Sequence, residues 1–406
     1  MAVMDHAPGT ATPGAPPKVN WVNDPKIRGI FWQVLLLAFV VFLVYGMVTN
    51  AYENLQRQRI ASGFGFLNNT AGFGLTMSII PYAETSSYGR AFLVGLLNTL
   101  VIAAIGVVAA TILGVIVGVA RLAKNWIVRQ IATVYVEFLR NIPLVLQLFF
   151  WYSAVLRPLP GPRESVGLPN GVFGTGIFLN NRGLIVPKPI YGDLAIGIAI
   201  AVVLGIVAVI VLARWAHARQ RATGQQFPVI WSSIGIILGA PLLAYFILGR
   251  PITLEFPTLR GFNFVGGDRI IPEFAALLLG LVLYTAAFIA EIVRAGIQAV
   301  HRGQTEASYA LGLRPGQALR LVVLPQALRV IVPPLTSQYL NLTKNSSLAV
   351  AVGYPDLVQI FAGTVLNQTG QAVEVVVITM AVYLTISLVT SLLMNLYNRR
   401  VALVER

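Results

Sequence analysis

The chain has 406 residues, of which 56% are hydrophobic and only 11% are charged, and its mean hydropathy is +0.75. Soluble globular domains carry about 25% charged residues, so this composition excludes an ordinary soluble protein, and the apolar content excludes intrinsic disorder. The net charge of +14 would favour a nucleic-acid partner in a soluble protein. Here the basic residues lie in short segments between apolar runs, which is typical of membrane orientation, so no nucleic-acid partner is expected.

Motifs for catalysis and metal binding are missing from the sequence. There is no cysteine and only three histidines, which lie far apart. The patterns HExxH, GxSxG and GxxxxGK[ST] do not occur, so a zincin, an α/β-hydrolase and a P-loop ATPase have no support. The sequence therefore predicts no metal site, no catalytic residue and no nucleotide cofactor in this chain.

Long apolar runs dominate the sequence. A bilayer core about 30 Å thick is crossed by about 20 apolar helical residues. Eight runs approach or exceed that length, at 31–48, 91–120, 131–156, 194–213, 229–248, 274–297, 330–352 and 373–397. The seventh is the least uniform, because Pro333, Pro334 and Lys344 interrupt it. The sequence predicts an all-α polytopic membrane protein with about eight transmembrane helices.

The distribution of Lys and Arg predicts the orientation of these spans. The proline-rich residues 7–18 do not resemble a signal peptide, so the first run is expected to remain as a span. The termini and the loops on their side carry 17 Lys and Arg residues, and the opposite loops carry 10. Because basic residues are retained on the cytoplasmic side, both termini are predicted to be cytoplasmic.

Small residues recur in the second run. Gly114 and Gly118 lie on one face of a helix, where a neighbouring backbone can approach closely. The spacing predicts a tight helix–helix contact and has no functional content by itself.

The loop after the sixth run, residues 303–317, has the pattern of two short helices meeting at a bend. Thr305 is suited to cap a helix with Glu306 in its first turn. Gly312 is placed to end that helix in a left-handed conformation, and Pro315 suits the start of the next. The small apolar residues share one face of the first helix, which predicts a docking face for a soluble partner; they are Ala307, Ala310 and Leu311. An ordinary connecting loop at the membrane surface is the alternative.

Ionisable and polar residues inside apolar runs are costly, so they should face the bundle, a watery cavity or an interface. Glu137 and Arg140 are three residues apart and are predicted to form a structural ion pair. A second polar group interrupts the seventh run, where irregular backbone has to line a cavity or be buried. The candidates for a translocation path are Glu291, Asn341, Lys344, Asn345 and Ser346. Helix–helix hydrogen bonding for the polar stretch, and an ion pair with Arg294 for Glu291, are the alternatives.

The loop at 303–317 resembles the E-A-A-x-x-x-G loop of ABC importer permeases. The pattern here is Glu306-Ala307-Ser308, then Gly312, then Val323-Leu324-Pro325, with Ser308 in place of the second alanine. Flanking segments extend the likeness over 91–156 and 273–400; they include Asn98-Thr99-Leu100, Arg140-Asn141-Ile142-Pro143 and Leu342-Thr343-Lys344-Asn345. Together they resemble the polar amino-acid permeases of the histidine/glutamine type. The Arg140-Asn141-Ile142-Pro143 sequence and the large size of the chain are similar to those of general L-amino-acid or glutamate/glutamine/aspartate/asparagine permease subunits.

The resemblance implies a five-helix type I ABC importer core with an extra N-terminal helix and an inserted helix pair. The expected parts are a cytoplasmic tail (1–28), an extra helix with a periplasmic loop (29–90), two core segments (91–156 and 273–406) and an insertion (157–272) whose role does not carry over.

The implied function is that of a non-enzymatic permease subunit that carries polar L-amino acids across the bacterial inner membrane. ATP and Mg²⁺ would bind to a separate ATPase dimer docking on Glu306, Ala307, Ser308, Gly312, Arg314 and Pro315. A second homologous permease and a periplasmic amino-acid-binding protein would be the other partners. The alternative is an ion-coupled secondary transporter or channel, which would show paired broken helices, whereas only one broken span is visible.

Overall fold

The computed structural model describes residues 25–57 and 63–401, so most of the predicted tail at 1–28 lies outside the described residues. The chain divides into two compact units, residues 1–64 and 65–406. The first contains α1 (Pro25–Arg57), whose apolar side chains from Ile27 to Val48 are exposed. A helix that is apolar all round and unpacked within its own unit suits a lipid environment.

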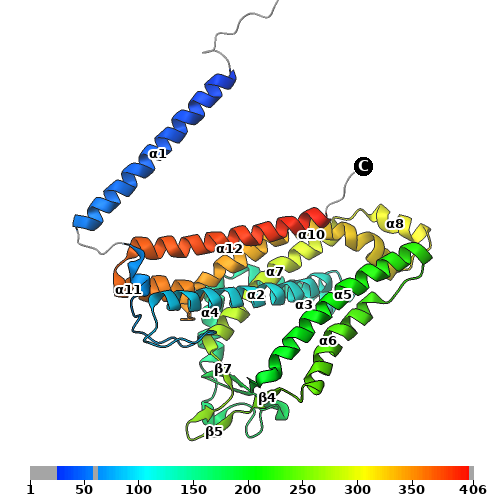
Figure 1. Cartoon of the computed structure of the whole chain (residues 1–406). Coiled ribbons are helices and arrows are strands. Elements are labelled where there is room, and N and C mark those ends of the chain that lie inside the picture. The colour runs from blue at the N-terminus through cyan, green and yellow to red at the C-terminus, as the bar shows by residue number, and fades with distance from the viewer. Residues whose placement is uncertain (1–24, 58–62, 402–406) are drawn as a thin grey trace, which may run out of the picture. The chain divides into compact units, whose positions relative to one another are not determined.

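The second unit is built from long helices, as predicted (Figure 1). Across both units, the described residues contain seven helices that are long and apolar enough to cross a membrane, or eight if one bent pair is counted as a span. Besides α1 they are α2 (Tyr88–Ala120), α5 (Ile196–Thr223), α6 (Val229–Ile247), α7 (Pro272–Gln298), α10 (Leu324–Asn345) and α12 (Ala372–Val401). The prediction of an all-α membrane protein with about eight spans is confirmed.

The third predicted span is a bent pair of helices instead of one straight helix. It consists of α3 (Trp126–Asn141) and α4 (Leu144–Phe149), which continues as a π-helix through Leu156, and the pair is bent by 108°. Pro143 has no N–H to donate and disfavours helical backbone at Ile142, which is extended at φ −98° and ψ 128°. The Gln147 amide donates to the carbonyls of Leu139 (2.9 Å) and Ile142 (3.0 Å). These bonds satisfy polar groups that the break exposes, as a low-dielectric environment requires.

Helices α2 and α7 pack closely at the glycines that the sequence singled out. A Cβ atom on Gly114 would lie 2.6 Å from the Ile289 Cβ, and one on Gly118 would lie 2.7 Å from the Ala290 carbonyl oxygen. The predicted tight contact is therefore confirmed, because no side chain larger than hydrogen fits at either position.

The segment before α2 packs on the core. Phe66 and Ala71 are buried together with Tyr88, Leu357 and Phe361. The structure thus groups residues 65–87 with the second unit, although the sequence placed them with the first helix in one part ending at residue 90.

Seven short strands, which the sequence analysis did not predict, form at the root of the insertion. They are β1 (Phe178–Asn180), β2 (Gly183–Val186), β3 (Lys188–Tyr191), β4 (Ile252–Glu255), β5 (Thr258–Arg260), β6 (Asn263–Val265) and β7 (Asp268–Ile270). The antiparallel sheets are β1–β2–β7, β3–β4 and β5–β6. Because β3 leads towards α5 and β4 follows α6, the β3–β4 pair holds the two ends of the inserted helical hairpin together.

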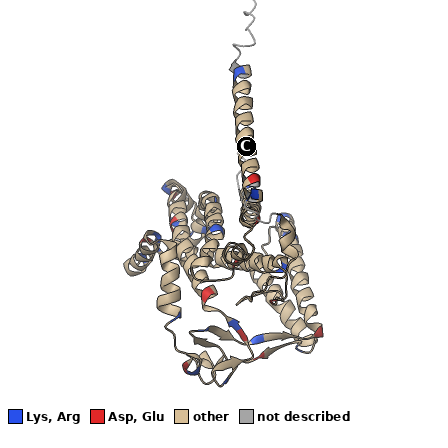
Figure 2. Cartoon of the chain, turned by 90° about the vertical axis from the view of Figure 1, so that its left-hand side faces the viewer, with Lys and Arg blue, Asp and Glu red and all other residues tan. Residues whose placement is uncertain are grey.

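The other α-helices among the described residues of this unit are short: α8 (Arg302–Ala310), α9 (Pro315–Ala318) and α11 (Leu366–Thr369). Helix α7 begins directly after β7 and ends just before α8, so the strands and α8 lie at opposite ends of a membrane-length helix (Figure 1). Figure 2 shows charged residues mainly near helix ends and among the strands. This distribution of charge suits a bilayer that surrounds the helices between the strands and α8.

Candidate functional site

The helix of the predicted docking loop begins earlier than expected. Helix α8 starts at Arg302, and the Nδ1 atom of His301 accepts a hydrogen bond from the Gly303 N–H at 3.1 Å. The predicted cap at Thr305 is therefore wrong, and Glu306 lies in the middle of α8, not in its first turn. The extended backbone of His301 lets an imidazole nitrogen satisfy a donor that the first helical turn leaves free.

The end of α8 follows the prediction. Gly312 has φ +77°, and its N–H donates to the Tyr309 carbonyl at 2.9 Å. Pro315 is the first residue of α9, and the Gln317 side chain accepts from the Arg314 N–H at 3.0 Å. However, α9 continues through the π-helical residues 319–323 into α10, so it is the start of the seventh span rather than a separate short helix.

The outer face of α8 is apolar and exposed. Ala307 and Ala310 are exposed, Leu311 is 82% exposed and Tyr309 is 48% exposed. Ser308 is the exception among the predicted docking residues, because its side chain is buried and its hydroxyl donates to the Thr305 carbonyl at 2.7 Å. Ser308 therefore faces the protein, while Glu306, Gly312, Arg314 and Pro315 remain exposed around the apolar face.

The predicted ion pair of Glu137 with Arg140 is replaced by a different arrangement. Arg121, directly after α2, bonds to Glu291 of α7 and lies 3.5 Å from the Glu137 carboxylate of α3. Arg294 also binds Glu291, with a distance of 3.2 Å from its Nε to Oε2. Arg121 is shielded from solvent and reaches across helices, which spacing along one helix does not reveal.

Arg140 lies elsewhere, with its guanidinium carbon 5.1 Å from the centre of the Phe288 ring. The prediction that it pairs with Glu137 is therefore wrong. Glu291, a predicted path residue, is held by two arginines, so the alternative of an ion pair fits it better. The charged cluster fastens α2, α3 and α7 at the end near α8.

The polar stretch of the seventh span is divided among three surroundings. Asn341 and Asn345, one helical turn apart, line a cavity of about 260 Å³ together with Thr285 of α7 and Gln338 of α10. Lys344 lines a separate, more open cavity against Tyr383 of α12.

The third surrounding is the protein interior. The Ser346 side chain is buried, and its hydroxyl donates to the Thr343 carbonyl at 2.7 Å. It thus makes the hydrogen bond within the bundle that was the alternative interpretation of the stretch.

The structure also reveals Asp356, which the sequence analysis missed. It lies between two spans, after α10 and before α12, and is fully buried. Its carboxylate accepts from the Gln359 N–H at 2.8 Å and from the Tyr383 hydroxyl at 3.2 Å. No Lys or Arg pairs with it within the described part of the chain. Burial without a cation raises the pKa of Asp356 to about 7.

Asp356 is expected to make stability pH-dependent. An acid with a higher pKa in the folded than in the unfolded state binds more protons when folded, so the free energy of unfolding falls as pH rises from about 4 to about 7. The full effect is up to about 4 kcal/mol. Thermal unfolding of the purified protein at pH 5 and 8 should show this fall, and Asp356→Asn should reduce it. The exposed Asp193→Asn is the control, and equal pH slopes in all three proteins would contradict the assignment.

Signals for Asp356 exist in the sequence but are weak. It follows Pro355 and precedes an apolar stretch, where an aspartate often caps a helix. Asn98 and Thr99 of α2 hold this turn: the Asn98 amide donates to the Pro355 carbonyl at 2.8 Å, and the Thr99 hydroxyl accepts from the Leu357 N–H at 3.1 Å. Such contacts between residues more than 250 positions apart depend on the tertiary fold.

Comparison with known proteins places these features in a family. Residues 222–403 match the family model of the binding-protein-dependent transport system inner membrane component. The general L-amino acid transport system permease protein AapQ of Rhizobium johnstonii is 54% identical over 94% of each chain. The putative amino-acid ABC transporter permease protein YhdX of Escherichia coli is 53% identical over 94% of this chain and 96% of its own.

A third relative is the glutamate/glutamine/aspartate/asparagine transport system permease protein BztB of Rhodobacter capsulatus, 44% identical over 96% of this chain and 99% of its own. These relatives are transport subunits rather than enzymes, and the family implies ATPase and binding-protein partners. Near-complete coverage at such identity confirms the family expected from the loop at 303–317. The chain therefore belongs to the binding-protein-dependent transport system inner membrane components, as a multi-pass permease subunit of the amino-acid ABC importer type.

Proposed function

We propose that this chain carries polar L-amino acids across the bacterial inner membrane, with both termini in the cytoplasm. An ATPase dimer that binds ATP and Mg²⁺ would dock on α8, a periplasmic protein would deliver the substrate, and a second homologous permease would complete the channel. The amino-acid transport systems to which the relatives belong support the amino-acid substrate. The exposed apolar face of α8, with Tyr309 and Leu311, is the single observation that carries the proposal, because an exposed apolar patch rimmed by polar residues is typical of a protein-binding surface.

The connection from α8 to the membrane supports a coupling role. The Gln326 amide of α10 donates to the Gln304 side chain of α8 at 3.3 Å. Residues 315–351 form one continuous span that starts directly after the bend at Gly312. A force on α8 would therefore reach α10, and docking that favours one position of α8 would favour one conformation of the permease.

The cavity between α7 and α10 is the proposed path for the substrate. Asn341, Asn345, Thr285 and Gln338 offer neutral donors and acceptors, which suit both the ammonium and the carboxylate of an amino acid. Its position on α10 places it on the helix that α8 would move. Lys344 lies on another face and is proposed to border the path from the α12 side.

The test is uptake of radiolabelled L-glutamine into proteoliposomes that contain the whole complex and the binding protein. We expect uptake to require ATP hydrolysis and to persist when ion gradients are collapsed. In the same vesicles, Asn345→Leu should raise KM about tenfold or more, because one charged or polar hydrogen bond to the substrate is lost. Uptake that follows an ion gradient without ATP would instead establish a secondary transporter.

A further inference from the structure

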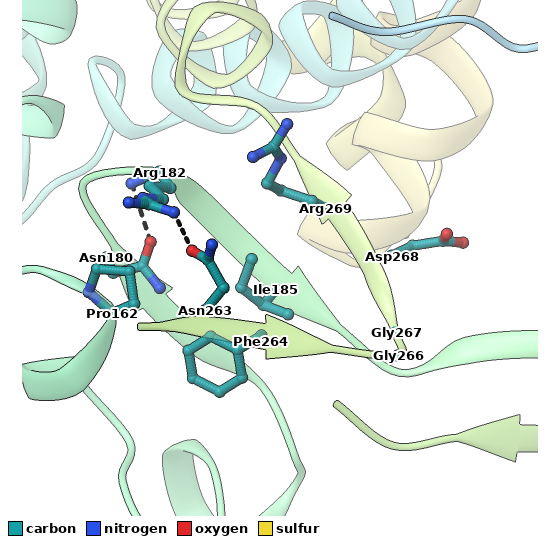
Figure 3. Close-up of a pocket in the computed structure, with 10 residues that line it drawn as sticks. All are labelled: Pro162, Asn180, Arg182, Ile185, Asn263, Phe264, Gly266, Gly267, Asp268 and Arg269. Atoms are coloured by element: carbon teal, nitrogen blue, oxygen red, sulfur yellow. Dashed lines mark hydrogen bonds between the residues drawn. The ribbon is translucent and has the colours of Figure 1, made fainter. Parts of the chain in front are cut away.

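The strand region at the root of the insertion contains a cavity of about 370 Å³, which the proposed transport path does not include (Figure 3). It lies between the turn that joins β1 to β2 and the segment from β6 to β7. Arg182, Asn263 and Arg269 provide hydrogen-bond donors, the first from the β1–β2 turn and the other two from the β6–β7 segment. This region is outside the five-helix core and has no role in the function argued so far.

The cavity is basic. The Arg182 guanidinium bonds to the Asn263 side-chain oxygen, which leaves the Asn263 amide group available as a donor. Arg269 makes no ion pair with any described residue. The one carboxylate in the lining, Asp268, precedes Arg269 on β7, and adjacent strand residues point to opposite faces. Figure 3 shows Asp268 directed away from Arg182 and Asn263, and neither arginine of the lining forms an ion pair with a described carboxylate.

The backbone around the two arginines is held in place before any ligand binds. The buried Asn180 side chain accepts from the Arg182 N–H at 2.9 Å and donates to the Ser165 hydroxyl at 2.9 Å. On the other wall, Arg269 is paired in register with Ile185 across β2 and β7. Donors on a fixed scaffold bind a ligand with a smaller entropic cost.

The position of the cavity suits a ligand on its way to the proposed path. The strands lie at the end of α7 opposite α8, and β7 continues through Ile271 directly into α7. The same helix carries Thr285, which lines the cavity between α7 and α10. A ligand that arrives from the side opposite the proposed ATPase would meet Arg269 near the start of α7, the helix that lines the proposed transport path.

We propose that this cavity is an outer binding site that recognises the carboxylate of a free amino acid. Guanidinium groups present paired N–H donors that match the two oxygens of a carboxylate, and the Asn263 amide adds a third donor group. The volume accommodates a small amino acid but not a folded partner. The proposal rests on the proposed function, which supplies the amino acid as the ligand class.

Hydrogen–deuterium exchange in the purified permease complex tests this proposal, with L-glutamine titrated in the absence of binding protein and nucleotide. We expect glutamine to slow exchange in peptides covering 183–186 and 268–270. The Arg182→Gln/Arg269→Gln double variant should need at least tenfold more glutamine for the same effect, because two charged hydrogen-bonding groups are lost. Lys188→Gln, which removes a positive charge from β3 outside the cavity, should behave as wild type.

Glutaminamide, which lacks the carboxylate, should give no protection. Equal protection by glutaminamide, or unchanged protection in the double variant, would overturn the proposal. Protection of the same peptides by inorganic phosphate at a lower concentration than glutamine would also overturn it. So would a double variant that loses only the docking of the binding protein and keeps its protection by glutamine. Each of these results is independent of the proposed function, which fails only if the wild-type complex takes up glutamine without ATP.

Discussion

Replacing Gly312 with Pro is expected to abolish ATP-driven uptake while the protein still inserts into the membrane. Gly312 has φ +77°, whereas proline is restricted to about −65°. Proline would also remove the N–H that donates to the Tyr309 carbonyl. The end of α8 would then lose its bend towards Pro315, and the proposed docking face would no longer be presented next to the start of α10.

Glu306→Lys should have a similar effect through charge alone, because it reverses the charge beside Ala307 and Leu311 on the exposed face. The measurements are uptake, stimulation of ATPase activity and co-purification of the ATPase, each compared with the amount of permease in the membrane. We expect uptake to fall at least about a hundredfold for Gly312→Pro, because strain of about 3 kcal/mol or more would lower the population of the native α8 conformation by about that factor.

Matched controls lie on the opposite side of the molecule. Gly249 follows α6 with φ +74° and donates its N–H to the Phe246 carbonyl at 3.2 Å, so Gly249→Pro creates the same backbone defect on the strand side. Glu164→Lys makes the same charge reversal there. Both controls should retain the ATPase. Normal docking in Gly312→Pro and Glu306→Lys would count against α8 as the coupling element.

Replacing Gly118 and Gly114 with valine is expected to separate α2 from α7 and to prevent stable folding. The new Cβ atoms would lie 2.6–2.7 Å from Ile289 and from the Ala290 carbonyl, so one helix must move. Overpacking of this kind typically costs about 1–3 kcal/mol per site, and the two sites share one interface. The shift would also disturb the charged cluster of Arg121 and Glu291 at the end of the same helices.

Thermal unfolding and yield of the purified permease measure this effect. Each single variant should unfold several degrees below the wild type, and the double variant should not be recovered as a folded protein. Gly235→Val in α6 is the control, because nothing lies within 4 Å of a Cβ at that position, and we expect a change below about 0.5 kcal/mol. Equal stability of Gly118→Val and Gly235→Val would refute the tight contact.

Features with a local physical cause were predictable from the sequence. The spans follow from apolar length, the left-handed glycine at 312 from the lack of a side chain, and Pro315 from its fixed φ. The glycine pair of α2 also follows from helical spacing. These predictions need only the residue and its neighbours along the chain, because the energies that decide them act over one or two helical turns.

Features that depend on distant partners were not predictable. Arg121 rather than Arg140 pairs with Glu137, since helix crossing brings the end of α2 beside α3. Asp356 is buried because residues from α2 and α12 close around its turn. The cavity that Arg182 and Arg269 line exists only because β2 pairs with β7. The paired residues of these strands are more than 80 positions apart in the sequence, with two membrane-length helices between them.

The sequence by itself determined the class of molecule and the approximate number of spans, and it located the loop that we propose as the coupling element. Hydrophobicity, backbone restriction and helical spacing are properties of short segments, and they do not depend on how those segments pack in the tertiary structure. Only the tertiary structure decided which charged and polar groups meet, and hence that Glu291 is held by arginines while Asn341 and Asn345 face a cavity. Electrostatic and hydrogen-bond partners are selected by packing, which no single segment encodes.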